Sequence, residues 1–250
     1  MQTLHTDQRD VTPRRVLPIL IAILVVRAAV ASAQSVPSER PPEPGPQPLN
    51  RPQVLHSFLA SFTPLKEQPF KGPYQPLTPS QSFNWFIKST ISPQHMAGVA
   101  IVSAGGTAVN RPGEYGPHWS GFADRFGIGM AGSAVGNGIE VSAGLALRED
   151  PRYFCVPERP FKSRMGNVAR FTFSARGENG TLVPAYARYI GIVGGNFLSN
   201  AWRVHSEANV PDALLRSSEG FAGRMAANAF AEFWPDVKKH VLHKRSRAAQ

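Results

Sequence analysis

Three segments of the chain are rich in glycine, alanine, valine and isoleucine, and in the first two of them small residues recur at a spacing of four. The segments cover residues 97–110, 127–147 and 186–202. Residues four apart lie on one face of a helix, and small residues there let a second backbone approach closely. We therefore expect helices whose packing faces consist of Ala100, Ala104 and Ala108 in the first segment, and of Gly132, Gly136 and Gly144 in the second.

The central segment, 127–147, is too rich in glycine to form a stable helix alone. Six glycines lie between positions 127 and 144, and each costs roughly 0.5–1 kcal/mol relative to alanine in a helix. Close packing against a neighbour, either protein or lipid, must offset that cost.

Glu140 continues the row of small residues in this segment. A buried carboxylate needs a cationic partner or stays protonated. We expect a structural ion pair, with Arg125, Arg148 or Lys88 as its partner, although simple exposure is the alternative.

Helix-start signals and apolar spacing predict further helices around these segments. Thr78-Pro79-Ser80-Gln81 is a capping box with proline at the first helical position, and Ser92-Pro93 starts a second helix that runs to about Val109. Apolar residues at helical spacing indicate two more helices, at 161–173 and at about 217–234, and Trp234-Pro235-Asp236 is expected to kink or restart the last one.

The fold class predicted from these signals is all-α, a bundle of about five to six helices. A strand interpretation is the alternative, because residues 170–174 alternate between polar and apolar side chains. The spacing of four in the central segment and its shortage of β-branched residues favour helices.

The N-terminus predicts export. Arg9, Arg14 and Arg15 precede an uninterrupted apolar run over residues 16–26, and Ala31-Ser32-Ala33 follows as an A-x-A site. This order is typical of a signal peptide covering 1–33. An uncleaved anchor is the alternative, but the run is short for a membrane span. Arg14-Arg15 also leaves the export route open between the general secretory and twin-arginine systems.

Proline and charge divide the rest of the chain. Residues 36–79 hold 12 of the 23 prolines, so 34–76 is interpreted as a disordered tether, 77–243 as the helical domain and 244–250 as a basic tail.

The net charge of +10 favours a membrane or an anionic envelope polymer as partner, and export argues against nucleic acid. A protein partner or a homo-oligomer stays open. Cys155 is the only cysteine, so no intramolecular disulfide can form.

Motifs for known chemistry are incomplete. Residues 127–132 fit G-x-G-x-x-G, but no buried strand precedes them, so no nucleotide cofactor is expected. Neither a G-x-S-x-G nucleophile motif nor H-E-x-x-H metal spacing occurs. The candidates for an acid or base are Glu140, Asp150 and His205.

Several short motifs together resemble a group of uncharacterised exported bacterial proteins. They are the T-P-x-Q-x-F helix start at Thr78, the Gly/Ala-rich middle, E-D-P-R-Y-F from Glu149 to Phe154, and E-F-W-P-D from Glu232 to Asp236. The resemblance covers about residues 77–240. It implies bacterial origin and an envelope location, either periplasmic or associated with the outer membrane, and it assigns no catalytic residue.

We therefore expect a non-enzymatic helical protein of the cell envelope, associated with membrane or packed through its glycine-rich helix faces. A soluble periplasmic binding or interaction module is the first alternative. An envelope hydrolase that uses Glu140, Asp150 or His205 is the second.

Overall fold

The computed structural model describes the chain from Tyr74 to Ala248, with side chains to His240. This region is mostly helical, with one small two-stranded sheet, so the all-α prediction is confirmed. The signal peptide predicted at 1–33 and nearly all of the predicted tether lie outside the described residues.

The helices follow one another with short connections. In chain order they are α3 (Pro79–Ile91), α4 (Pro93–Ala108), α5 (Trp119–Leu147), α6 (Phe161–Phe173), α7 (Tyr186–Ser199) and α8 (Val210–Ala248). Short 3₁₀ turns, η2 (Gly113–Tyr115) and η3 (His205–Glu207), precede α5 and α8. The antiparallel hairpin of β1 (Ser174–Arg176) and β2 (Leu182–Pro184) joins α6 to α7.

The start of α3 is as predicted. Thr78 accepts a hydrogen bond from the Gln81 backbone, and the Gln81 side chain accepts one from the Thr78 backbone, which completes the capping box. Ser92 ends α3 and caps α4 through a hydrogen bond from the His95 backbone. These caps fix the bend between the two helices.

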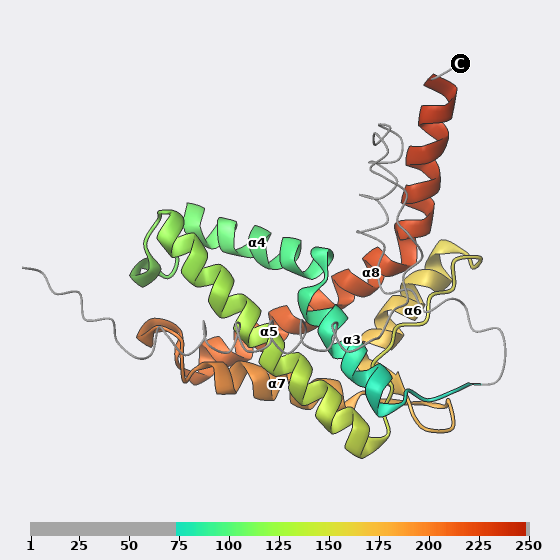
Figure 1. Cartoon of the computed structure of the whole chain (residues 1–250), viewed down its shortest axis with the longest axis horizontal. Helices are drawn as coiled ribbons and strands as arrows, with labels where there is room; N and C mark the ends of the chain where they lie inside the picture. Colours follow the sequence, from blue (N-terminus) through green and yellow to red (C-terminus); the bar gives the residue numbers. More distant parts are fainter. Residues whose placement is uncertain (1–73, 249–250) are drawn as a thin grey trace, which may run out of the picture.

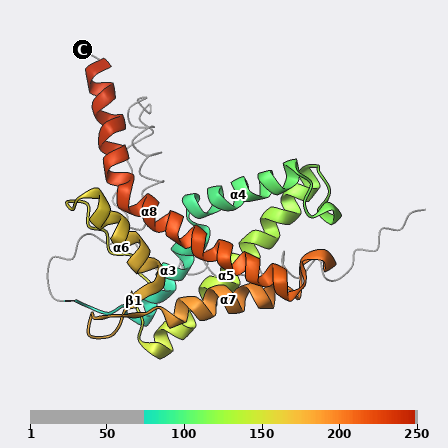
Figure 2. The ribbon, with the colours of Figure 1, turned by 180° about the vertical axis from the view of Figure 1, so that it is seen from behind.

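Helix α5 is the central element, and α3, α4 and α7 all pack against it (Figure 1). Helix α8 covers α7 and α6 on the side seen in Figure 2. The last helix is longer than predicted, because it begins at Val210 and continues through Pro235 to Ala248. It bends along its length, so its C-terminal part projects from the body of the domain (Figure 1). A proline inside a helix removes one backbone hydrogen bond and is a usual cause of such a bend.

Glycine makes the contact between α5 and α7 close. A Cβ atom placed on Gly191 would lie 2.8 Å from the Gly136 carbonyl oxygen, and one on Gly195 would lie 2.8 Å from the Gly136 Cα. Gly144 is close to the Glu149 carbonyl oxygen, at 3.1 Å from such a Cβ. A side chain at Gly191 or Gly195 would push the backbones of α5 and α7 apart, whereas one at Gly144 would press on the turn that follows α5.

The other expected packing residues occupy different environments. Gly132 has open space where a Cβ would be. Ala100 is half-buried, and Ala104 and Ala108 are exposed. The close contacts of α4 with α5 lie instead on its opposite side, at Val99 against Gly129 and at Gly106 against the Arg125 side chain.

Candidate functional site

Glu140 lies at the centre of a buried ion cluster formed by three helices. Its side chain on α5 is only 3% exposed. The Arg188 guanidinium on α7 donates from Nε to Glu140 Oε1 at 3.1 Å, and Arg224 on α8 donates to Glu140 Oε2. The expectation of an ion pair therefore holds, but the partners are Arg188 and Arg224, rather than Arg125, Arg148 or Lys88.

The three expected partners are engaged or placed elsewhere. Arg125 donates to the carbonyl oxygens of Arg111, Pro112 and Gly116, and so holds the turn after α4. Arg148 pairs with Glu178 on the surface at 2.5 Å. Lys88 is exposed on α3.

Arg188 also caps the C-terminal end of α6. Its Nη1 donates to the carbonyl oxygens of Phe171 and Thr172, at 2.6 and 3.1 Å. The last carbonyl groups of a helix carry partial negative charge and have no partner within the helix. Arg188 therefore stabilises two groups at once, the Glu140 carboxylate and the end of α6.

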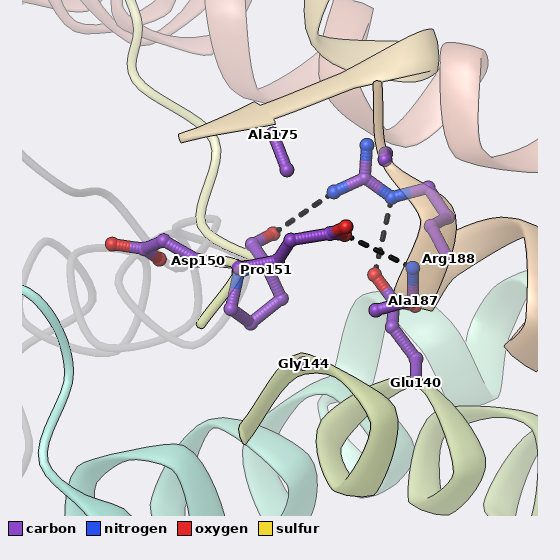
Figure 3. Close-up of a pocket in the computed structure, with 9 residues that line it drawn as sticks. Glu140, Gly144, Asp150, Pro151, Ala175, Ala187 and Arg188 are labelled. Atoms are coloured by element: carbon purple, nitrogen blue, oxygen red, sulfur yellow. Dashed lines mark hydrogen bonds and ion pairs between the residues drawn. The ribbon is translucent and has the colours of Figure 1, made fainter. Parts of the chain in front are cut away.

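A cavity of about 10 Å³ lies beside this cluster. Figure 3 shows Glu140, Asp150, Pro151 and Arg188 around it. A space of this size holds about one water molecule. It is too small for an organic substrate.

Asp150 and Glu149 line the same cavity, yet both carboxylates are already engaged. Asp150 pairs with Arg152 at 2.6 Å and accepts a hydrogen bond from the Tyr74 hydroxyl at 2.9 Å. Burial, and then the Asp150 charge, raise the pKa of Tyr74. Glu149 accepts a hydrogen bond from the Ala187 backbone at 2.9 Å, at the N-terminal end of α7, where an acidic side chain is favourable.

His205, the third candidate, is not part of this group. It lies exposed on η3 and does not line the cavity. The structure thus brings Glu140 and Asp150 to one cavity and leaves His205 outside it. Arginines pair with both carboxylates, and the cavity beside them has the volume of about one water molecule.

A second buried cluster joins the two motifs that carry the sequence resemblance. Glu232 on α8 is the bulkiest fully buried side chain of the described residues. The Tyr153 hydroxyl donates to Glu232 at 2.6 Å, and the Val156 backbone donates to it at 3.0 Å. Arg164 on α6 pairs with both Glu232 and Asp236, at 3.2 and 2.5 Å. E-D-P-R-Y-F and E-F-W-P-D therefore meet in space as one structural junction.

Many large apolar side chains of the described residues are exposed. They occur on α4 (Ile101, Val102, Val109), on α7 (Tyr186, Ile190, Phe197, Leu198) and at the start of α8 (Val210, Leu214, Leu215). The buried apolar residues, in contrast, include many alanines. Single exposed apolar residues are common in proteins that dissolve in water, but repeated ones on several helices indicate an interaction surface.

Sequence reasoning missed Arg188, Arg224, Arg164 and Glu232. The sequence does contain a signal that Arg188 pairs with Glu140. Arg188 is the single charged residue of α7, and Glu140 is the single charged residue of the last half of α5. Two isolated opposite charges in two glycine-rich helices are candidates to pair.

The described residues contain no group of three or more His, Cys, Asp or Glu side chains that could hold a metal ion. Across the same residues, no helix combines the length and apolar character that a membrane span requires. Comparison with known proteins gave no match, whether to a protein family, to a curated protein or to a solved structure.

Proposed function

We propose that the protein is a non-enzymatic component of the bacterial cell envelope that binds at the membrane interface through exposed apolar helix faces. The observation that carries this proposal is the distribution of side chains. Charged residues such as Glu140, Arg188 and Glu232 are buried and paired, while large aliphatic residues on α4, α7 and α8 face outward.

Exposed aliphatic side chains are unfavourable in water and favourable in lipid. Fully burying one aliphatic side chain is worth about 1.5–3 kcal/mol, so leaving many of them in water forfeits that stabilisation. In an apolar environment the same side chains are favourable, and ionisable groups face the protein interior and pair. The close glycine contacts between α5 and α7 supply packing that needs no aqueous hydrophobic effect.

Interfacial binding fits the described helices better than spanning does. An interfacial helix lies in the plane of the headgroups with its apolar face in the acyl boundary, and anionic lipid attracts its basic neighbours. The net charge of +10 supports such a partner. The soluble-module alternative would use the same outward aliphatic residues to bind a protein partner, so the location of the protein in the cell distinguishes the two functions.

Fractionation of cells that produce the native chain tests the proposal. We expect the protein in the membrane fraction, with a substantial part retained after alkaline carbonate, because apolar contacts survive a treatment that removes electrostatically held proteins. Recovery of the whole protein in the soluble fraction before carbonate would refute membrane association. Salt alone should release little.

A further inference from the structure

Helix α4 differs from the other helices because it carries no Asp, Glu, Lys or Arg along its 16 residues. Its outward side presents Ile101 and Val102, and Val109 follows as its C-terminal cap; the three are 73%, 76% and 66% exposed. Small residues separate them, including Gly98 and Gly105, each with open space beside its Cα. A helix of this length presents an uncharged face about 24 Å long.

Two polar side chains of α4, Ser103 and Thr107, are directed away from this face. Ser103 is buried, and the Thr107 hydroxyl donates to the Ser103 carbonyl oxygen at 2.8 Å within the helix itself. Among the described residues α4 packs on α5 and α3, and in both views it lies at the edge of the molecule with these helices on one side (Figures 1 and 2). The outer face from Gly98 to Val109 therefore offers no charged group with which to orient a protein partner.

Exposed cationic and aromatic residues flank α4 in the sequence. Lys88 precedes α4 at the end of α3, and Arg111 follows its C-terminal end; both side chains are exposed. Trp119 begins the next helix and is 82% exposed. An uncharged helix with exposed cations just before and after it, and an exposed tryptophan at the start of the next helix, has the residue types that suit a bilayer surface, where acyl chains lie beneath anionic headgroups.

We propose that the outer face of α4 is the surface that enters the bilayer, and that Lys88 and Arg111 select anionic phosphate headgroups. This inference rests on the proposed membrane function and assigns it to one helix and one lipid class. Helix α4 would lie in the plane of the interface, with Ile101, Val102 and Val109 among the acyl chains.

Flotation of the full chain with vesicles tests the assignment. The vesicles contain phosphatidylcholine alone or phosphatidylcholine with phosphatidylglycerol. We expect the double substitution I101Q/V102Q to lower the vesicle partition coefficient about tenfold or more, because it removes two aliphatic side chains without adding charge. The matched control is Leu182→Gln on β2, at a position 42% exposed, which should leave partitioning unchanged.

A second pair of variants tests the choice of lipid. Lys88→Gln and Arg111→Gln should each reduce binding to phosphatidylglycerol vesicles about fivefold, with little effect on phosphatidylcholine vesicles. Both side chains are exposed, and the carbonyl group of Arg111 that bonds Arg125 is retained, so circular dichroism should show the wild-type fold. Equal losses on both kinds of vesicle would overturn the selection of anionic headgroups.

The outcomes separate the two proposals. If the wild-type chain does not float with either vesicle, the membrane function fails. If it floats and I101Q/V102Q floats equally, the function stands and the assignment to α4 is wrong. A change in the oligomeric state of I101Q/V102Q, with unaltered flotation, would show that the face binds a second copy instead and would also overturn the inference.

Discussion

Arg188 on α7 donates a hydrogen bond to Glu140 on α5 at 3.1 Å, and both side chains are about 3% exposed. Beside this pair, the glycines of the two helices bring their backbones close together. The ion pair and the glycine contacts thus form one interface, because a bulkier residue at Gly191 would displace the Glu140 side chain itself.

Replacement of Glu140 by Gln should strongly destabilise the fold. It would leave the Arg188 and Arg224 cations without their carboxylate, and breaking a buried pair from one side typically costs about 3–5 kcal/mol. Urea unfolding followed by circular dichroism measures the loss. The control is Glu178→Gln in the exposed pair with Arg148, where little change is expected because water screens the pair. Equal stability of the two variants would contradict a structural role for Glu140.

Two glycines of α7 should respond in opposite ways to alanine. At Gly191 the new methyl group would lie 2.8 Å from the Gly136 carbonyl oxygen, whereas Gly194 has nothing within 4 Å. We expect Gly191→Ala to destabilise by about 1–3 kcal/mol through overpacking. Gly194→Ala should stabilise by up to about 1 kcal/mol through helix propensity. Thermal unfolding of both variants checks the prediction, and similar shifts in Tm would refute the close contact.

The turn after α4 should depend on arginine at position 125. The Arg125 guanidinium donates to three carbonyl oxygens, and one Lys ammonium cannot reproduce that planar arrangement. Losing buried hydrogen bonds of a charged group costs about 1.5–3 kcal/mol, so Arg125→Lys should lower the free energy of unfolding by that amount. Arg170→Lys, at an exposed position, is the control. A stability loss confined to the control would contradict the role of Arg125.

Stability should depend on pH through His95. Burial, and then the positive charge of Arg224, lower the pKa of His95 below its usual 6.5. The unfolded chain therefore binds a proton before the folded chain does as the pH falls. The contribution of His95 to stability is present above pH 6.5 and is lost as the pH falls from there toward the folded-state pKa.

Urea unfolding of the wild type and of His95→Gln, at several pH values between about 7.5 and 5, measures this contribution. The free energy of unfolding should fall more steeply for the wild type. Parallel curves for the two proteins would show that His95 does not contribute.

The local signals in the sequence predicted much of the fold, because their physical causes are local. Thr78 and Gln81 form their capping box within four residues, and the spacing of glycine in α5 predicted a helix with a close neighbour. Local signals could not predict that the neighbour is α7. Gly136 meets Gly191, and Glu140 meets Arg188, across about 50 residues of chain, and their pairing depends on how α5 and α7 cross.

Helix α4 shows why its packing face was unpredictable. The row Ala100, Ala104 and Ala108 has the spacing of a contact face, but the opposite side contains Val99 and Gly106 and is equally free of charge. When a helix is apolar all round, periodicity cannot indicate which side is buried. A kink or a restart was predicted at Pro235, and the helix continues through it; sequence alone left these two outcomes open because a proline allows either a stop or a bend.

The depth of residue 101 in a bilayer tests the central claim most directly. The buried Cys155 is first replaced by alanine, so that a fluorophore can be attached at a single cysteine. One protein carries an environment-sensitive fluorophore at Ile101→Cys. The control protein carries it at Glu178→Cys, which is exposed on the hairpin turn. On addition of phosphatidylglycerol vesicles with acyl-chain nitroxides, the probe at 101 should shift to the blue and be quenched, while the probe at 178 should not change. An unquenched probe at 101 on vesicle-bound protein would place α4 outside the bilayer, and absence of binding by both proteins would contradict membrane association itself.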